Sequence, residues 1–350
     1  MTRYGSAFVI GMLSALLIAC GACGPSPDKA AQPTQEARPK IGLLMDTVQE
    51  GRWQRDRDLF LERAKQLGAD VLVESAELDD ARQLQQAESL LARDVQVLVV
   101  VPHSAEAAGQ IVEAAKKRSV PVISYDRLIL KADVDLYISY DNRMVGELQA
   151  QHLRNRAPTG NYILLGGAPT DNNAKLIREG QMAALEDAVK RREIKIVADP
   201  WTPDWQADPA MTLTETALKK AGNQVVAVVA SNDITAGGAI KALEKHGLAG
   251  KVLVSGQDAN LDAVRRIVNG TQTMTVYKPL RPLARGAAAA AVQLAKGEKV
   301  EGTSTVNNGT KQVQAILLTP IAVHKDLVDQ IIINDKFHTR EQVYGAAGSK

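Results

Sequence analysis

The chain has 350 residues, 42 of them basic and 40 acidic, with a formal net charge of +2. Apolar residues make up 45% and charged residues 23%, which indicates a globular chain long enough for two domains. The near balance of charge gives no reason to expect a nucleic-acid partner, so none is predicted.

The N-terminus reads as an export signal. A short basic segment is followed by an apolar run over residues 7–19, too short for a membrane-spanning helix. The run ends in "LIAC", which resembles the bacterial lipobox, so we expect residues 1–19 to be a lipoprotein signal peptide and Cys20 to be lipidated. The alternative is a plain signal peptide with an unmodified cysteine. Cys23 also follows small residues but lacks a leucine three places before it.

The next segment is rich in proline, alanine and polar residues, so residues 20–39 are expected to form a flexible tether behind the lipid. The body would then work in the periplasm or cell envelope, held at a membrane through Cys20. It has no further cysteine, and its five histidines show no ligand spacing. We therefore predict no disulfide, no thiol nucleophile, no metal site and no cofactor.

From residue 40 onward, short apolar runs alternate with longer helical stretches. Strands are expected at 41–45, 71–75, 97–101, 120–124 and 136–139, and then at 162–165, 194–197, 225–229, 252–255 and 273–276. Helices are expected at 52–67, 80–93, 105–118, 143–155, 173–191, 207–221 and 235–246. This alternation predicts an α/β fold with two lobes, each a parallel sheet covered on both faces.

The stretch "QEGRWQRDRD", residues 49–58, follows the first expected strand. Trp53, Phe60, Ala64 and Leu67 share one helical stripe, so Trp53 is expected to anchor its helix in the core. Arg52 is expected at the N-terminal end of that helix, where the helix dipole disfavours a cation. It therefore needs a specific acceptor, and the carboxyl end of a parallel strand is where α/β proteins bind ligands.

Polar side chains follow six of the expected strands. Any single one is explained by a turn or a helix cap. Together they predict paired donors and acceptors that converge between the lobes, suited to an uncharged polyol. The side chains are Asp126, Arg127, Asp141, Asn142, Asp171, Asn172, Asn173, Asn232, Asp233, Asp258 and Lys278. Trp201 and Trp205 lie in an irregular stretch that no core stripe explains, and stacking on a ligand is favoured for Trp205 over Trp201.

These residues carry a resemblance to the type I periplasmic sugar-binding proteins of ABC transporters, and within that group to the D-xylose-binding proteins. It covers residues 40 to about 335. The matching runs are "GRW" at 51–53, "YDR" at 125–127, "YISYDN" at 137–142, "VGELQA" at 145–150, "DNNAK" at 171–175, "ASNDITAGGAI" at 230–240, "SGQDA" at 255–259 and "GTQTMTVYKP" at 270–279. Gly51 departs from the family, where a charged residue is expected.

The resemblance implies a fold of two doubly wound lobes with sugar bound between them. The implied contacts are Arg52, Arg127, Asp171, Asn173, Trp205, Asn232, Asp258 and Lys278, with Trp53, Asp126, Asn172, Trp201 and Asp233 as neighbours. It also implies three hinge segments, near 142–143, 277–278 and 305–307. The first lobe would comprise 40–142 and 278–305, the second lobe 143–277 and 306–335, and 336–350 would be a tail.

The function implied is delivery of a monosaccharide, D-xylose foremost, to the membrane permease of an ABC transporter by a monomeric lipoprotein. Another aldose, or presentation of sugar to a chemoreceptor or sensor kinase, remains open. An enzyme is not expected, because the chain lacks hydrolase, nucleotide-binding and metalloprotease motifs. A sugar-responsive DNA-binding regulator would need a helix-turn-helix in place of the export signal.

Overall fold

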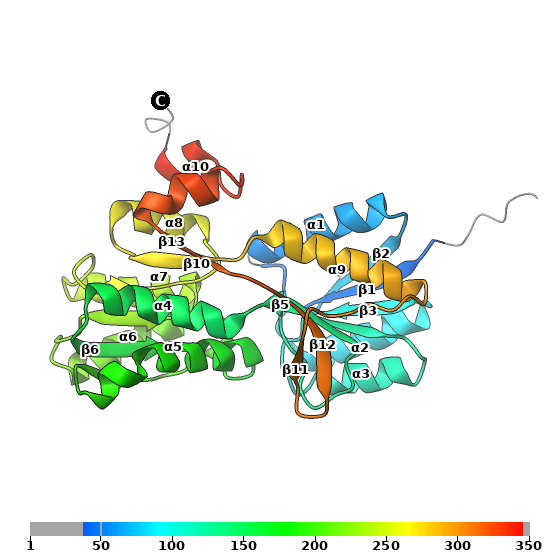
Figure 1. Cartoon of the computed structure of the whole chain (residues 1–350), viewed down its shortest axis with the longest axis horizontal. Coiled ribbons are helices and arrows are strands. Elements are labelled where there is room, and N and C mark those ends of the chain that lie inside the picture. The colour runs from blue at the N-terminus through cyan, green and yellow to red at the C-terminus, as the bar shows by residue number, and fades with distance from the viewer. Residues whose placement is uncertain (1–37, 50, 346–350) are drawn as a thin grey trace, which may run out of the picture. The chain divides into compact units, whose positions relative to one another are not determined.

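The computed structural model describes residues 38–49 and 51–345 (Figure 1). The predicted signal peptide, Cys20 and the tether up to residue 37 lie outside the described residues, as do residues 346–350. Within the described ranges, no helix is both long and apolar enough to cross a membrane.

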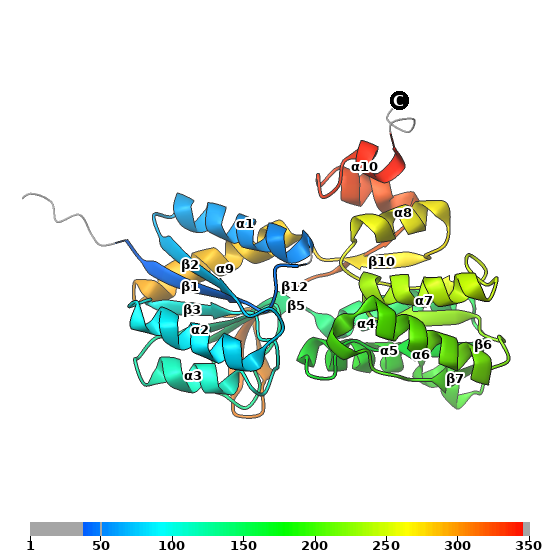
Figure 2. The ribbon, with the colours of Figure 1, turned by 180° about the vertical axis from the view of Figure 1, so that it is seen from behind.

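The first lobe is built on a seven-stranded sheet with the order β11-β12-β5-β4-β3-β1-β2. Its strands are β1 (Lys40–Met45), β2 (Asp70–Ser75), β3 (Val97–Val100), β4 (Val122–Tyr125), β5 (Leu136–Tyr140), β11 (Ser304–Asn307) and β12 (Gln312–Leu318). All neighbours pair in parallel except β11 and β12. Helices α1 (Gly51–Gln66) and α9 (Leu280–Ala295) cover one face, and α2 (Asp80–Ala92) and α3 (Gly109–Lys116) cover the other (Figures 1 and 2).

The second lobe has a parallel four-stranded sheet with the order β7-β6-β8-β9. Its strands are β6 (Gly160–Leu165), β7 (Ile194–Ala198), β8 (Ala227–Ala230) and β9 (Leu253–Val254). Helices α4 (Asn142–Arg156) and α5 (Asn172–Lys190) pack on one face, and α6 (Ala207–Lys220) and α7 (Asp233–Lys245) pack on the other. The short helix η1 (Pro203–Trp205) precedes α6.

A small subdomain completes this lobe. Strands β10 (Met274–Tyr277) and β13 (Ile321–His324) pair antiparallel, and a bridge from Gln257 to Val276 joins β10 to the region after β9. Their apolar side chains share a core with α8 (Leu261–Asn269), η3 (Val328–Ile333) and α10 (Arg340–Tyr344), with η2 (Lys325–Leu327) before η3.

Burial explains why these segments form parallel sheets. Every residue of β3, β4, β5 and β8 is buried, as expected for strands covered by helices on both faces. The helix starts have a local cause: an aspartate or asparagine cap stands directly before each of α2, α4, α5 and α7. The α/β architecture predicted from the alternating pattern is therefore the observed one.

The third crossing between the lobes differs from the expectation. Residues 306–318 were assigned to the second lobe, with a crossing near 305–307, but β11 and β12 form a hairpin in the first sheet. Strand β12 pairs in parallel with β5, from Ala315 opposite Tyr137 to Leu318 opposite Tyr140. The chain therefore reaches the second lobe only between Leu318 and Ile321, because the backbone hydrogen bonds of β12 hold it beside β5.

The expected tail is also partly wrong. Residues 336–344 belong to the packed subdomain, since Phe337, Val343 and Tyr344 join its apolar core. Helix α10 begins with a capping box in which the side chains of Thr339 and Gln342 satisfy each other's backbone N–H groups. Burial of these apolar side chains keeps the segment on the second lobe.

Helices α4 and α5 approach each other closely at Gly180. A Cβ atom placed there would lie 1.9 Å from the backbone oxygen of Arg143 on α4. Backbone cannot move aside as a flexible side chain can, so this contact requires glycine.

We expect Gly180→Ala to lower the free energy of unfolding by about 1–3 kcal/mol, because the methyl group forces α4 and α5 apart. Gly286→Ala on α9 is the matched control, since a Cβ there meets no atom within 4 Å. It should be neutral or stabilising by up to about 1 kcal/mol, because alanine favours helix. Urea unfolding measures both, and equal effects of the two substitutions would contradict the close contact.

Candidate functional site

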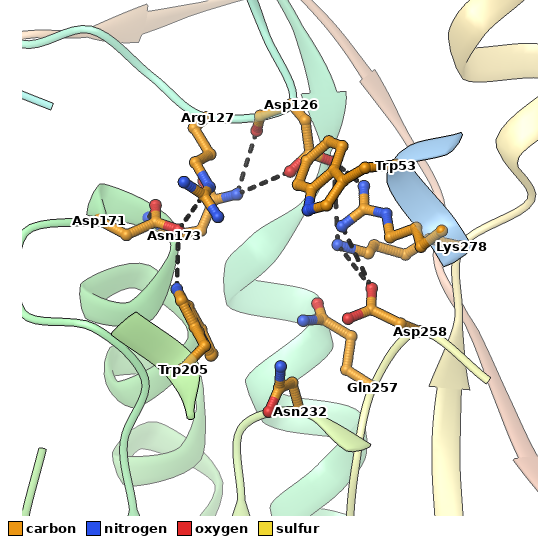
Figure 3. A pocket seen from close by; sticks show the side chains of 11 residues that line it. Trp53, Asp126, Arg127, Asp171, Asn173, Trp205, Asn232, Gln257, Asp258 and Lys278 are labelled. Atoms are coloured by element: carbon orange, nitrogen blue, oxygen red, sulfur yellow. Dashed lines mark hydrogen bonds and ion pairs between the residues drawn. The ribbon is translucent and has the colours of Figure 1, made fainter. Parts of the chain in front are cut away.

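The carboxyl ends of strands from both lobes meet around one polar cavity (Figure 3). It is lined by Arg52, Trp53, Asp126, Arg127, Asp171, Asn173, Trp205, Asn232, Gln257, Asp258 and Lys278. The set includes every side chain predicted as a direct contact, although its role in binding stays a prediction. The cavity volume is about 30 Å³, enough to hold ordered water among these polar groups.

Arg52 lies at the centre of the site and joins the two lobes. Its guanidinium forms an ion pair with Asp126 of the first lobe, and its Nη1 lies 3.4 Å from Oδ1 of Asp258 of the second. Asp56, one turn along α1, lies 4.0 Å from Nη2. Burial alone would lower the pKa of Arg52, but these three carboxylates outweigh it and raise that pKa above its ordinary value. The acceptor predicted for a cation at this helix start is therefore present.

Asp126 and Asp258 are shared with a second cation. Lys278 Nζ lies 3.3 Å from Asp258 Oδ1 and 3.9 Å from Asp126 Oδ2. Burial alone would raise the pKa of Asp126, but Arg52 and Lys278 outweigh it and lower that pKa to about 2. Asp126 was expected only as a neighbour that orients the contacts, whereas it lines the cavity itself.

A second chain of polar contacts runs from Asp46, at the end of β1, to Trp205. Arg127 Nη1 lies 2.6 Å from Asp46 Oδ2, and its Nε lies 2.9 Å from Asp171 Oδ2 across the lobes. The indole Nε1 of Trp205 donates to the same Asp171 oxygen at 3.2 Å. Burial raises the pKa of Asp171 although Arg127 opposes that shift. Figure 3 shows Trp205 below Asp171 and Arg127 above it.

Tryptophan rings form the less polar boundary of the cavity. The guanidinium carbons of Arg52 and Arg127 lie 4.2 Å and 5.5 Å from the centre of the Trp53 ring. Trp53 is 2% exposed and packs in the core between α1, α9 and the sheet of the first lobe. It therefore both anchors its helix and lines the cavity. Trp205 approaches the backbone at Gly167, where a Cβ would lie 2.1 Å from its ring. Glycine at that position makes room for the indole.

Two lining amides also belong to helix starts. Asn173 Nδ2 donates to the backbone oxygen of Asp126 at 3.1 Å, and its own N–H donates to the Asp171 cap at 2.8 Å. Asn232 caps α7, with its side-chain oxygen accepting from the backbone N–H of Thr235 at 2.9 Å. The cap interpretation and the ligand interpretation are thus compatible for Asp171 and Asn232, because a cap fixes the side chain at the cavity wall.

Three residues predicted as neighbours do not line the cavity. Asn172 is the first residue of α5 but is absent from the lining. Trp201 packs on the guanidinium of Arg178, at 5.3 Å from its ring centre. Asp233 is buried and accepts hydrogen bonds from Gln272 and from the backbone N–H of Asn260. Burial raises its pKa to about 7. Its hydrogen bond from the Asn260 N–H supports the loop that carries Asp258.

Sequence reasoning overlooked several groups at the site. Gln257 lines the cavity, and its side-chain oxygen is buried without a hydrogen-bond partner among the described residues. Its place after β9, beside Asp258, was the available signal.

Asp46 and Asp56 lie behind the arginines and were also overlooked. Burial raises the pKa of Asp56 to about 7 although Arg52 opposes it. The fully buried Tyr125 donates its hydroxyl to Asp56, and no local pattern marks that pair.

The lining residues also hold strained backbone. Asp126, Trp205 and Asp258 have φ angles of +60°, +60° and +93°, a region that side chains with a Cβ rarely adopt. Such strain persists only where the surrounding contacts hold it, and it gathers at functional sites. Within the described ranges, no group of three or more potential ligands is arranged to hold a metal ion.

We expect the ionised Asp126 to stabilise the fold above its unfolded pKa of 3.8, with the contribution lost as pH falls towards the folded value of about 2. The contribution amounts to about 2 kcal/mol from the size of the shift. Asp126→Asn should be less stable at pH 7 because Arg52 and Lys278 lose their partner. Its unfolding free energy should fall less between pH 4 and pH 2 than that of wild type. Parallel curves from urea unfolding would contradict the ion-pair assignment.

Comparison with known proteins gives a consistent result. A family described as the periplasmic binding protein domain matches residues 41–299. The D-xylose-binding periplasmic proteins of Haemophilus influenzae and Escherichia coli are 51% and 48% identical, each covering 87% of this chain and 92% of the relative. The solved structure of a carbohydrate transporter solute-binding protein from Chloroflexus aurantiacus, in complex with D-glucose, has a TM-score of 0.81 and 32% identity, covering 86% of this chain and 97% of that one. The chain therefore belongs to the periplasmic binding protein family.

Proposed function

We propose that this protein is the solute-binding component of an ABC sugar importer, which binds D-xylose between its lobes and delivers it to a membrane permease. The observation that carries the proposal is the polar cavity, supported by two relatives near 50% identity that are named for D-xylose. The relatives' names also support a periplasmic location. The family consists of substrate-binding proteins, and we propose no enzymatic activity.

The lining suits a small polyol. Arg52, Arg127 and Lys278 would donate to hydroxyl and ring oxygens, and carboxylates would accept from hydroxyl groups. Because these groups are buried and paired with one another, sugar hydroxyls would exchange with existing ion pairs. A sugar lacking a hydroxyl at the right place would leave buried charge without a partner, which gives selectivity.

Binding would favour the arrangement in which the lobes meet. Arg52 and Asp126 come from the first lobe, and Asp171, Trp205 and Asp258 come from the second. A ligand that touches both sets interacts fully only when they approach, so it shifts the population towards that form. The permease would recognise that form.

Another aldose is the second candidate. The Chloroflexus neighbour holds D-glucose on the same fold at 32% identity. A pentopyranose and a hexopyranose differ by one hydroxymethyl group, and a few contacts decide between them. The proposal therefore depends on a direct comparison of sugars.

Calorimetry of the mature chain with D-xylose, L-arabinose, D-ribose, D-glucose and D-galactose tests this. D-xylose should bind most tightly, and Arg52→Ala should abolish the heat because Asp126 and Asp258 lose the shared cation. Trp205→Ala should weaken binding at least tenfold, or about 1.4 kcal/mol. Trp201→Ala is the matched control and should bind as wild type does. Tighter binding of a different sugar would overturn the assignment of D-xylose as the ligand. The absence of heat with every sugar tested would overturn sugar binding.

The lipid anchor is a separate proposal, since Cys20 lies outside the described residues. The lipobox-like run before Cys20 supports acylation, which would hold the protein at a membrane. We expect Cys20→Ser to move the protein from the membrane fraction to the soluble fraction, with loss of acyl mass from the N-terminal peptide. Cys23→Ser should leave both unchanged. Fractionation measures the location of the protein, and mass spectrometry measures the acyl mass. Retention of Cys20→Ser in the membrane fraction would contradict the anchor.

A further inference from the structure

The segment 335–338 of the second lobe reaches back to α1 of the first lobe. Arg55 Nη1 on α1 donates to the backbone oxygen of Phe337 at 2.6 Å. The guanidinium carbon of Arg55 lies 5.0 Å from the centre of the Phe337 ring, so the contact is both a charge-assisted hydrogen bond and a cation–π contact. Arg55 stands three residues after Arg52 on the same helix. We call Arg55 and residues 335–338 the clasp.

Two cavities adjoin the clasp. One of about 440 Å³ lies beside Leu280 and Tyr277, and another of about 390 Å³ lies beside Arg52 and Asn260. Arg55 and Phe337 line both of them. Phe337 packs on the subdomain behind it, whereas Arg55 lies between the two cavities. Removal of the Arg55 side chain should therefore weaken the link between the lobes.

The other end of the clasp supports the loop of Asp258. His338 is 5% exposed, and its Nε2 lies 2.8 Å from the backbone oxygen of Ala259. A carbonyl only accepts, so Nε2 carries the proton. Burial lowers the pKa of His338, which favours the neutral ring. Asp258 and Ala259 are consecutive non-glycine residues with φ of +93° and +51°, so this hydrogen bond holds strained backbone.

The clasp also touches the strand that leads to Lys278. The Tyr277 hydroxyl donates to Asp335, and the ring centres of Tyr277 and Phe337 lie 4.8 Å apart. One short segment thus contacts the helix that carries Arg52, the loop that carries Asp258 and the strand that ends before Lys278. These three side chains share ion pairs with one another in the cavity, and Asp126 completes the group.

We propose that Arg55, Phe337 and His338 are positioning residues for sugar binding, which hold Arg52 and Asp258 in register across the two lobes without touching the ligand. The inference rests on the proposed function and deepens it. The clasp is a second link between α1 and the loop of Asp258. It lies outside the cavity in which Arg52 and Asp258 pair directly. Its loss should let bound sugar escape faster while the side chains that contact the sugar stay in place.

The first test is sugar release, followed by stopped-flow fluorescence of the cavity tryptophans with D-xylose as ligand. Arg55→Ala should raise the dissociation rate and weaken affinity about fivefold, as expected for an exposed contact of this kind, with little change in association rate. Arg57→Ala is the matched control, because Arg57 on the same helix pairs with its neighbour Asp58 at 2.8 Å. It should stay within twofold of wild type. Equal rates for Arg55→Ala and wild type would overturn the role of the clasp.

The second test needs no sugar. Hydrogen exchange should be at least tenfold faster at the backbone amides of 258–260 in His338→Ala, because the strained loop loses its hydrogen bond. His338→Gln, which keeps an N–H donor, should restore part of the protection and of the sugar affinity. Unchanged exchange in His338→Ala would overturn the proposal. If wild type binds no aldose, the proposed function fails, and the exchange result still decides whether the segment holds the loop.

Discussion

The guanidinium of Arg52 is the group on which the site depends. It is buried, and its charge is balanced by Asp126 from one lobe and Asp258 from the other. A buried charge without a partner costs several kcal/mol, so the carboxylates on both lobes are held to it. Their loops adopt strained backbone at Asp126 and Asp258 to reach this position. The strain is tolerated because the electrostatic attraction and the surrounding hydrogen bonds oppose it.

The fold provides this arrangement through a simple rule of parallel sheets. Strands of both lobes point their carboxyl ends towards the same space, and most of them lead through a loop into a helix. Asp171 and Asn232 each cap a helix and line the cavity. Capping fixes the side-chain rotamer, so polar groups are preorganised before any ligand arrives, which lowers the entropic cost of binding.

Three contacts between the two lobes lie at different distances from the cavity. Arg52 and Asp258 meet inside the cavity, Arg127 and Asp171 meet beside it, and Arg55 and Phe337 meet outside it. A ligand that exchanges with the inner contacts would change the balance of the outer ones. This is how a local event of binding can alter the relative stability of lobe arrangements.

Much of this protein could be predicted from sequence alone. The alternation of short apolar runs with helical stretches predicted the α/β architecture. Polar residues after strands predicted much of the cavity lining, because strand polarity places them at one edge. Local patterns could not predict that β12 lies beside β5, that residues 336–344 pack, or that Asp56 and Tyr125 pair behind Arg52. Those features depend on backbone pairing and burial between segments far apart in the chain. Only the tertiary structure brings such segments together, and with them the contacts that decide which polar groups face the cavity.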